Sequence, residues 1–369
     1  MSLRFQIALS QIKGIGPVLA KNLIAYIGNA EGVFRESQAN LAKIPDIGIA
    51  LSKQIKQQQT EALNRADKEL FFIHKYNINT VFYTDKDYPY RLKECADSPI
   101  ILFTKGNISL NGSRNIALVG TRDATEYGKE LCCNLIKDLA KFVPDATIVS
   151  GLAYGIDICA HKASVEVNLP TIGIVGHGLD RLYPAQHRQT TVKMLEMGGL
   201  VSEYLSETIP EKQNFVQRNR LIAGLCDAII VVESAEKGGS LITADMAQSY
   251  NRDVFAFPGR VGDTQSAGCN RLISSNKAGL ITSASDLIQA MCWEINPEQN
   301  TVIQPSLFME LTEIQQIVVG ILRKTETLSV NELAIALQMP VSKTSSLLLE
   351  MEFNGIVKCL PGNVYKLRP

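Results

Sequence analysis

Between residues 115 and 287, short apolar runs alternate with longer stretches whose apolar side chains have helical spacing. The runs are Asn115–Val119, Thr147–Ser150, Thr171–Val175, Ala228–Val232 and Val254–Phe257, and helices are expected at Tyr127–Lys141, Asp157–Glu166, Gln186–Met197 and Ser240–Tyr250. Runs that are apolar throughout are typical of parallel strands covered by helices on both faces. The alternation predicts a doubly wound parallel α/β sheet over residues 80–290, with ligands at the carboxyl ends of the strands.

The N-terminal segment contains an internal repeat. Lys13–Lys21 matches Pro45–Lys53, and each copy has the pattern of a helix, a glycine turn and a second helix. Residues 1–75 are therefore predicted to form a helix-hairpin-helix doublet. Glycine at such a turn leaves backbone amides free to hold a DNA phosphate, but a small protein-binding bundle has the same pattern. The sequence leaves both roles open.

The C-terminal residues follow a third pattern. Residues 293–310 contain two prolines and no periodicity, which indicates a linker. Residues 311–369 contain three helical runs followed by a two-stranded segment, which predicts a winged-helix domain. This tail has six basic residues against five acidic ones, and its expected recognition helix, Ser342–Asn354, carries two glutamates near its end. We therefore expect the tail to contact protein rather than to read a DNA groove.

Charge and cysteine spacing exclude several functional classes. The chain has 37 basic and 37 acidic side chains, so any binding of nucleic acid must depend on a local basic groove. Its eight cysteines include no Cys-x-x-Cys pair, which predicts reduced thiols, no structural metal and no cofactor. The apolar runs are far shorter than a membrane helix, and the N-terminus lacks an export signal, so we expect a cytoplasmic chain without membrane contact.

Two loops that follow predicted strands carry residues suited to anions. The first strand leads into Gly120-Thr121-Arg122, which is not the Gly-x-Gly-x-x-Gly pattern of dinucleotide sites. Arg122 at the end of a strand can reach an anion above the sheet, and Thr121 adds a hydroxyl donor. The second strand ends at Gly151 in a loop of small residues, whose backbone amides would form an anion nest.

Other loops at the same edge of the sheet give weaker signals. The stretch Lys237-Gly238-Gly239-Ser240 opens a helix and provides a further N-terminus suited to an anion. Asp157 and His161 are four residues apart on one helical face, so one hypothesis is a catalytic dyad. A helix-start cap by Asp157, with His161 packed beneath it, explains the same spacing, and we favour it.

The stretch that precedes the fourth strand combines cations with an aromatic ring. Lys212, Arg218 and Arg220, with Asn219 among them, are suited to holding successive phosphates. Phe215 offers a ring for base stacking, and this combination is what single-stranded nucleic acid binds. Phe215 is equally compatible with a place in the core, where lone aromatic residues are usually found.

These motifs occur in a characteristic order: Tyr88-Pro89, Asp97-Ser98-Pro99, Gly120-Thr121-Arg122, Ser150–Asp157, Gly178-Leu179-Asp180, Ser202-Glu203-Tyr204, Phe215 with Arg218-Asn219-Arg220, Gly238–Ala244 and Phe257-Pro258-Gly259. In order and spacing they resemble the DprA/Smf family, bacterial proteins that process incoming DNA during natural transformation. The resemblance covers about Tyr88 to Ile281, and the flanking hairpin and winged-helix segments fit it.

The resemblance implies an extended Rossmann-like domain that is not an enzyme. It implies a homodimer that binds single-stranded DNA, protects incoming DNA, and loads the RecA recombinase in natural transformation or homologous recombination. Arg122 resembles the arginine of the family's Gly-Ser-Arg motif, while Lys212, Phe215, Arg218 and Arg220 resemble its DNA-contacting segment.

Two positions depart from the family pattern. Thr121 replaces the usual serine, which keeps the hydroxyl and adds a methyl group. Gly238 stands where a serine is common, which removes one possible donor. Neither departure changes the expected function.

Two other functional classes remain open from the residues alone. A nucleotide or phosphosugar hydrolase would use the same glycine loops, with Glu203 or Asp157 as the base. An assembly scaffold would use the two end domains to contact proteins. Neither explains an aromatic ring placed among three cations.

Overall fold

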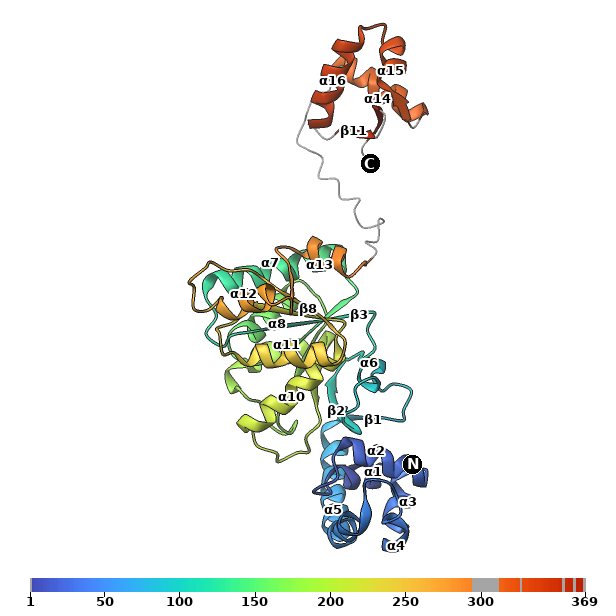
Figure 1. Cartoon of the computed structure of the whole chain (residues 1–369), viewed down its shortest axis with the longest axis vertical. Helices are drawn as coiled ribbons and strands as arrows, with labels where there is room; N and C mark the ends of the chain where they lie inside the picture. Colours follow the sequence, from blue (N-terminus) through green and yellow to red (C-terminus); the bar gives the residue numbers. More distant parts are fainter. Residues whose placement is uncertain (1, 294–311, 326, 354–355, 361–362, 368–369) are drawn as a thin grey trace. The chain divides into compact units, whose positions relative to one another are not determined.

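The computed structural model describes residues 2–293, 312–325, 327–353, 356–360 and 363–367 (Figure 1). The chain divides into two compact units, residues 1–299 and 300–369. The predicted linker at 293–310 lies outside the described residues, apart from Trp293. Among the described residues, no helix has both the length and the apolar character needed to cross a membrane.

A nine-stranded sheet forms the centre of the larger unit, in the order β1-β2-β6-β5-β4-β3-β7-β8-β9. The five predicted runs form β3 (Arg114–Gly120), β4 (Ala146–Ser150), β5 (Thr171–Ile174), β7 (Ala228–Glu233) and β8 (Asp253–Ala256). The strands from β6 through to β9 in this order pair in parallel. This arrangement confirms the predicted doubly wound α/β fold.

Four strands of this sheet were not predicted from the sequence, and two of their pairings are antiparallel. The missed strands are β1 (Asn79–Phe82), β2 (Ile101–Gly106), β6 (Gly199–Ser202) and β9 (Gly279–Leu280). β2 runs antiparallel to both β1 and β6, so the sheet is mixed at this edge. Antiparallel edge strands on an otherwise parallel sheet are common, because such pairing needs no crossover helix.

Helices cover both faces of the sheet (Figure 1). Ile116 and Leu118 of β3 pack with the helices of one face, and Ala117 and Val119 with those of the other, as the two-residue period of a strand requires. The first face carries α7 (Glu126–Phe142), α8 (Ile156–Glu166) and α13 (Ala284–Ala290); the second carries α10 (Lys212–Leu225), α11 (Gly239–Ser249) and α12 (Ala267–Ser274). The other helical elements of this part of the chain are α6 (Tyr90–Lys93), the 3-10 helix η1 (Ala185–His187) and α9 (Arg188–Met197).

Five helices form the N-terminal part: α1 (Leu3–Ser10), α2 (Pro17–Ile27), α3 (Ala30–Arg35), α4 (Gln38–Leu41) and α5 (Gly48–Tyr76). The turn before α2 contains Gly14 at φ 85°, a left-handed conformation that favours glycine. The predicted hairpin doublet is confirmed. Its hydrophobic core continues without a break into the sheet, because Phe82, Ile101 and Phe103 pack in the same cluster. We call this helical part the hairpin domain.

The smaller unit has the predicted winged-helix fold. Helices α14 (Glu313–Thr325), α15 (Val330–Ala336) and α16 (Val341–Phe353) pack with a sheet in the order β10-β12-β11. Its strands are β10 (Thr327–Ser329), β11 (Val357–Leu360) and β12 (Val364–Leu367). The core includes Val318, Leu322 and Leu348.

Candidate nucleic-acid interface

A small pocket opens at the carboxyl edge of the sheet, where ligands were expected. The loops after β3, β4 and β5 and the helix α10 form its walls, and its volume is about 60 Å³. It is lined by Arg122, Gly151, Leu152, Ala153, Tyr154, Tyr183, Pro184, Phe215 and Arg218. We call it the edge pocket. Four of the predicted site residues, Arg122, Gly151, Phe215 and Arg218, therefore meet in one place.

Aromatic rings form one wall of the edge pocket. Phe215 is half-buried, and its ring stacks on that of Tyr183 with centroids 5.7 Å apart and planes inclined by 26°. The guanidinium carbon of the exposed Arg122 lies 6.0 Å from the Phe215 ring centroid. Tyr183 and Tyr154 are 47% and 42% exposed, so their rings remain accessible to a ligand. Phe215 is thus neither a pure core residue nor a fully exposed one.

The sequence analysis did not select the two tyrosines as site residues. Both belong to loops that follow strands, at the edge where ligands were expected. An aromatic residue in such a loop was the available signal, because it has no helical or strand periodicity that assigns it to the core.

Arg218 is buried, which the sequence analysis did not predict. One of its terminal nitrogens, Nη1, donates to the carbonyl oxygens of Gly151, at 2.6 Å, and Ile174. Burial lowers its pKa to about 10, opposed by the nearby charge of Asp157. Arg218 precedes Leu221 by three positions on the buried stripe of α10. That spacing was a readable sign that this arginine faces inward.

Gly151 lies against this buried charge. A Cβ atom at this position would come within 2.5 Å of Arg218 Nη1 and 2.6 Å of Asp157 Oδ2. Its N–H donates to Asp157 Oδ2 at 3.1 Å, so that amide is already used. The predicted anion nest is therefore occupied in part by the protein's own carboxylate.

Asp157 and His161 do not form a dyad. The Asp157 carboxylate faces back to the loop, where it also accepts the N–H of Ala153 at 3.3 Å, while His161 Nδ1 lies 2.7 Å from Thr171 Oγ1. Burial raises the pKa of Asp157, and it lowers the pKa of His161 to about 3, which makes this imidazole a weak base. His161 is packed in the core, as the favoured interpretation expected. Asp157, however, accepts N–H groups of the loop that precedes its helix instead of capping the helix itself.

Arg220 faces the opposite side of α10 from the edge pocket. Its guanidinium donates to Glu203 Oε2 and, at 2.7 Å, to the carbonyl of Asp97. Burial raises the pKa of Glu203, and the charge of Arg220 opposes that rise. Arg122 and Arg218 thus line the edge pocket at the carboxyl edge of the sheet, whereas Arg220 lies outside it. Contact of these arginines with DNA stays a prediction.

The remaining predicted residues surround the edge pocket or lie apart from it. Lys212 is exposed at the first turn of α10, and Asn219 is half-buried. Thr121 donates its N–H to the carbonyl of Glu233 at 2.7 Å, and Gly120 packs closely on Ile156.

The described residues Lys237–Ser240 do not line the edge pocket. Gly238 is the N-cap of α11, Gly239 is its exposed first residue, and Lys237 is exposed. The buried Ser240 hydroxyl donates to Ser234 Oγ at 2.9 Å. Contact of this stretch with DNA stays a prediction.

Among the described residues, no group of three or more His, Cys, Asp or Glu side chains has an arrangement that could hold a metal ion. Four of the eight cysteines, Cys95, Cys132, Cys226 and Cys269, are buried. Burial raises the pKa of the Cys226 thiol well above its ordinary value.

Three segments of the chain match known protein families. Residues 79–292 match the family described as DNA recombination-mediator protein A. Residues 6–58 match the SAM-like helix-hairpin-helix tandem, and residues 305–363 match the DprA winged helix domain.

Similar proteins cover most of the larger unit. The DNA processing protein DprA of Bacillus subtilis is 41% identical over 224 residues, which are 60% of this chain and 73% of that protein. The structure of DprA from Streptococcus pneumoniae has a TM-score of 0.65 and 31% identity, covering 79% of this chain and 98% of that one. A structure of DNA processing protein A from Helicobacter pylori, described as revealing its single-stranded DNA binding mode, has a TM-score of 0.54 and 29% identity, covering 60% and 98%.

Proposed function

Because this chain belongs to the DprA/Smf family of DNA recombination mediators, we propose that it binds single-stranded DNA at the edge pocket. The single-stranded DNA binding mode described for the Helicobacter pylori relative supports this proposal. The observation that carries it is the stack of Phe215 on Tyr183 beside the Arg122 guanidinium. A partly exposed ring next to a cation stacks a base and neutralises its phosphate without reading its sequence.

Binding without catalysis is the second part of the proposal. The carboxylates that a hydrolase would use as its base are both engaged with protein groups. Glu203 is paired with Arg220, and Asp157 accepts two backbone N–H groups beside Arg218. Oε1 of Glu203 has no described donor, but Glu203 does not line the edge pocket, so neither carboxylate is placed as a general base beside the proposed DNA site.

Fluorescence anisotropy with a labelled oligo(dT) tests the binding, and release of product from nucleotides is followed in parallel. We expect sub-micromolar affinity for the oligomer and no turnover. Weak binding of the oligomer together with turnover of a nucleotide would contradict this proposal and would indicate that the chain is a hydrolase.

We also propose a more specific role. The chain forms a homodimer that loads the RecA recombinase on single-stranded DNA, in transformation or in general recombination. Equilibrium sedimentation of the full chain should give twice the chain mass. The DNA-dependent ATP hydrolysis of RecA on strands covered by a single-strand-binding protein should rise when the chain is added. No rise with a chain that binds the same DNA tightly would remove the loading role.

We propose that the two end domains contact protein rather than DNA. The first hairpin supports this, because Ile15, Gly16 and Pro17 of its turn face the sheet domain across a pocket instead of facing outward. The backbone N–H of Lys13 in the same turn donates to Gln58 Oε1 at 2.9 Å, so this amide is already bonded within the hairpin domain. Removing the winged tail should leave affinity for single-stranded DNA within about threefold, and a larger loss would place DNA contacts in it.

A further inference from the structure

A second and larger pocket lies on the other side of α10. It is enclosed by that helix, the loop before β2 and the first hairpin, and its volume is about 480 Å³. We call it the hairpin pocket. Its apolar walls include Ile15 and Pro17 from the hairpin and Ile100 from the sheet domain. This volume is in the range that small-molecule sites occupy in proteins.

Glu203, a carboxylate with one unused oxygen, belongs to the lining of the hairpin pocket. Oε2 of Glu203 accepts from Arg220, but no described residue donates to the buried Oε1. A buried acceptor without a partner is costly, so a ligand that donates a hydrogen bond here would relieve that cost. The site is therefore suited to an N–H donor rather than to an acceptor.

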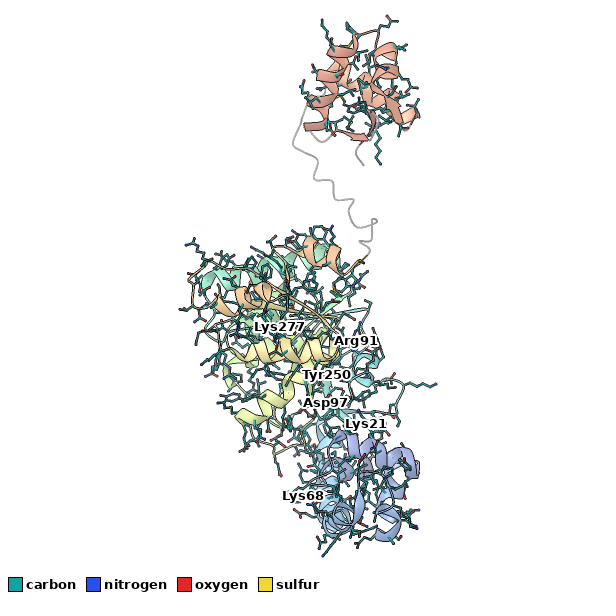
Figure 2. The ribbon with its side chains drawn as sticks, viewed as in Figure 1. Lys21, Lys68, Arg91, Asp97, Tyr250 and Lys277 are labelled. Atoms are coloured by element: carbon teal, nitrogen blue, oxygen red, sulfur yellow. The ribbon has the colours of Figure 1, made fainter. Side chains whose placement is uncertain are left out.

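The walls around this carboxylate are fixed by other hydrogen bonds. Tyr250 donates its hydroxyl to Asp97 Oδ1 at 2.7 Å, and Lys21 of α2 donates to Ser98 Oγ at 2.7 Å. Figure 2 shows Tyr250, Asp97 and Lys21 in succession where helix α11 approaches the hairpin domain. The Lys21 bond joins the hairpin domain to the sheet domain, and the Tyr250 bond fixes Asp97 within the sheet domain.

The N-terminus of α2 supplies a complementary group. Gly16 and Pro17 both line the pocket, and Gly16 caps the helix without a side-chain hydrogen bond. The N–H groups in the first turn of a helix have no partner within that helix, and they favour an acceptor or an anion. The pocket thus combines a donor-seeking carboxylate, an apolar slot and an acceptor-seeking helix end.

We propose that the hairpin pocket binds a nucleobase that carries an exocyclic amino group, with the amino group donating to Glu203 Oε1. Carboxylates accept hydrogen bonds from the amino group of cytosine, whereas thymine presents a carbonyl oxygen at the same position. The flat ring fits between the apolar walls, and its phosphate faces the start of α2. Cytosine, adenine and guanine present such an amino group. Thymine presents only its ring N3–H, which is flanked by two carbonyl oxygens that the carboxylate repels, so we expect thymine to bind more weakly.

The base comes either from the bound DNA strand or from a free nucleotide. Phe215 and Arg218 line the edge pocket, while Val216, Gln217 and Arg220 of the same helix line the hairpin pocket. A helix with its side chains is about 10–12 Å wide, so a strand that crosses α10 can present bases on both sides. The strand source rests on the proposed function, whereas the free-nucleotide source does not.

Photo-crosslinking tests the strand source with the full chain. An oligo(dT) carries a single 5-iodocytosine or, at the same position, a single 5-iodouracil, and crosslinked peptides are identified by mass spectrometry. We expect the 5-iodocytosine to crosslink to Met246 or to residues 97–101, at least fivefold more than the 5-iodouracil. Calorimetry with dCMP and TMP tests the free-nucleotide source, for which dCMP should bind at least tenfold more tightly.

A blocking variant and its control make the result specific. Val216→Trp places an indole at the mouth of the hairpin pocket, and Val192→Trp makes the same change at an exposed valine of α9 outside both pockets. The preference for cytosine should fall at least fivefold in the first variant and persist in the second. A preference that survives Val216→Trp would overturn the proposal.

The role of the carboxylate is tested by replacing the ion pair as a whole. Glu203→Leu with Arg220→Met exchanges it for apolar side chains of similar volume, which avoids leaving one charge buried alone. The preference for cytosine should disappear, and a thermal melt shows whether the variant folds; if it does not, the Val216→Trp result decides. Equal binding of both bases by the unaltered chain, with oligo(dT) bound tightly, would refute this proposal alone. If the unaltered chain does not bind oligo(dT), the proposed function is refuted instead.

Discussion

Replacing Phe215 by alanine separates base stacking from packing at the edge pocket. Stacking of a base on an aromatic ring contributes about 1–3 kcal/mol. At about 1.4 kcal/mol per factor of ten, Phe215→Ala should weaken oligo(dT) binding roughly 5- to 140-fold. A fully buried phenylalanine costs about 3–5 kcal/mol of stability on truncation. Because Phe215 is only half-buried, we expect about half of that cost, near 2 kcal/mol.

The assay pairs fluorescence anisotropy at fixed salt with urea unfolding of the same preparations. Phe71→Ala is the matched control, because Phe71 is 70% exposed on α5 and lines neither pocket. The control should change neither the affinity nor the unfolding free energy by a measurable amount. A double-mutant cycle with Tyr183→Ala should give a coupling energy in stability of about 0.5–1.5 kcal/mol for the stacked pair.

One outcome would refute the reasoning directly. If Phe215→Ala unfolds as expected but binds oligo(dT) within twofold of the unaltered chain, the ring is only a packing residue. The loss of stability would show that the Phe215 ring is packed in the unaltered chain. The unchanged affinity would then mean that this packed ring does not stack on a base.

Further predictions concern the charge, the backbone and the tail. Arg122→Ala should lower the salt slope of oligo(dT) binding by roughly 0.7 for one phosphate, and an unchanged slope and affinity would remove Arg122 from the site. Gly151→Ala should destabilise the chain by about 1–3 kcal/mol in urea, because its Cβ meets Arg218, and an unchanged midpoint would contradict that clash. His161 has a pKa lowered to about 3 from 6.5, so its contribution to stability is complete above pH 6.5 and is lost as the pH falls toward 3; His161→Gln should flatten this dependence in urea melts. A fragment of residues 311–369 should bind no duplex tightly at physiological salt, and one sequence bound with nanomolar affinity would overturn the protein-contact role.

The strands that the sequence predicted contain runs rich in apolar residues. A continuous apolar run such as Ile229–Val232 is enough to predict a buried strand without any tertiary information. β7 accordingly begins where it was expected. The missed strands are short or lie near an edge. β6 consists of four residues and begins at Gly199, so neither its length nor its composition distinguishes it from a turn. Its pairing with β2 depends on partners that are distant in the sequence.

The positions of the cations around α10 followed less clearly from the sequence. Arg218 and Arg220 are two residues apart, so about 200° of helical rotation separates them and they cannot share one face. That argument is available from spacing alone. What spacing does not reveal is that each arginine is already engaged by protein oxygens, because Gly151, Glu203 and Asp97 come from separate loops. Only the tertiary fold brings those oxygens to the helix.

The core shared by the hairpin domain and the sheet has a consequence for the order of events on the ribosome. Helix α5 ends at Tyr76, but its buried Glu69 accepts the backbone N–H of Ser206 at 3.0 Å, and the cluster beneath it also needs Leu205. These partners emerge 130 residues after the helix ends. At about 5–20 residues per second, the five nascent helices wait roughly 6–26 s with an open apolar side. A chaperone that recognises exposed apolar surface therefore has this interval in which to act on the hairpin domain.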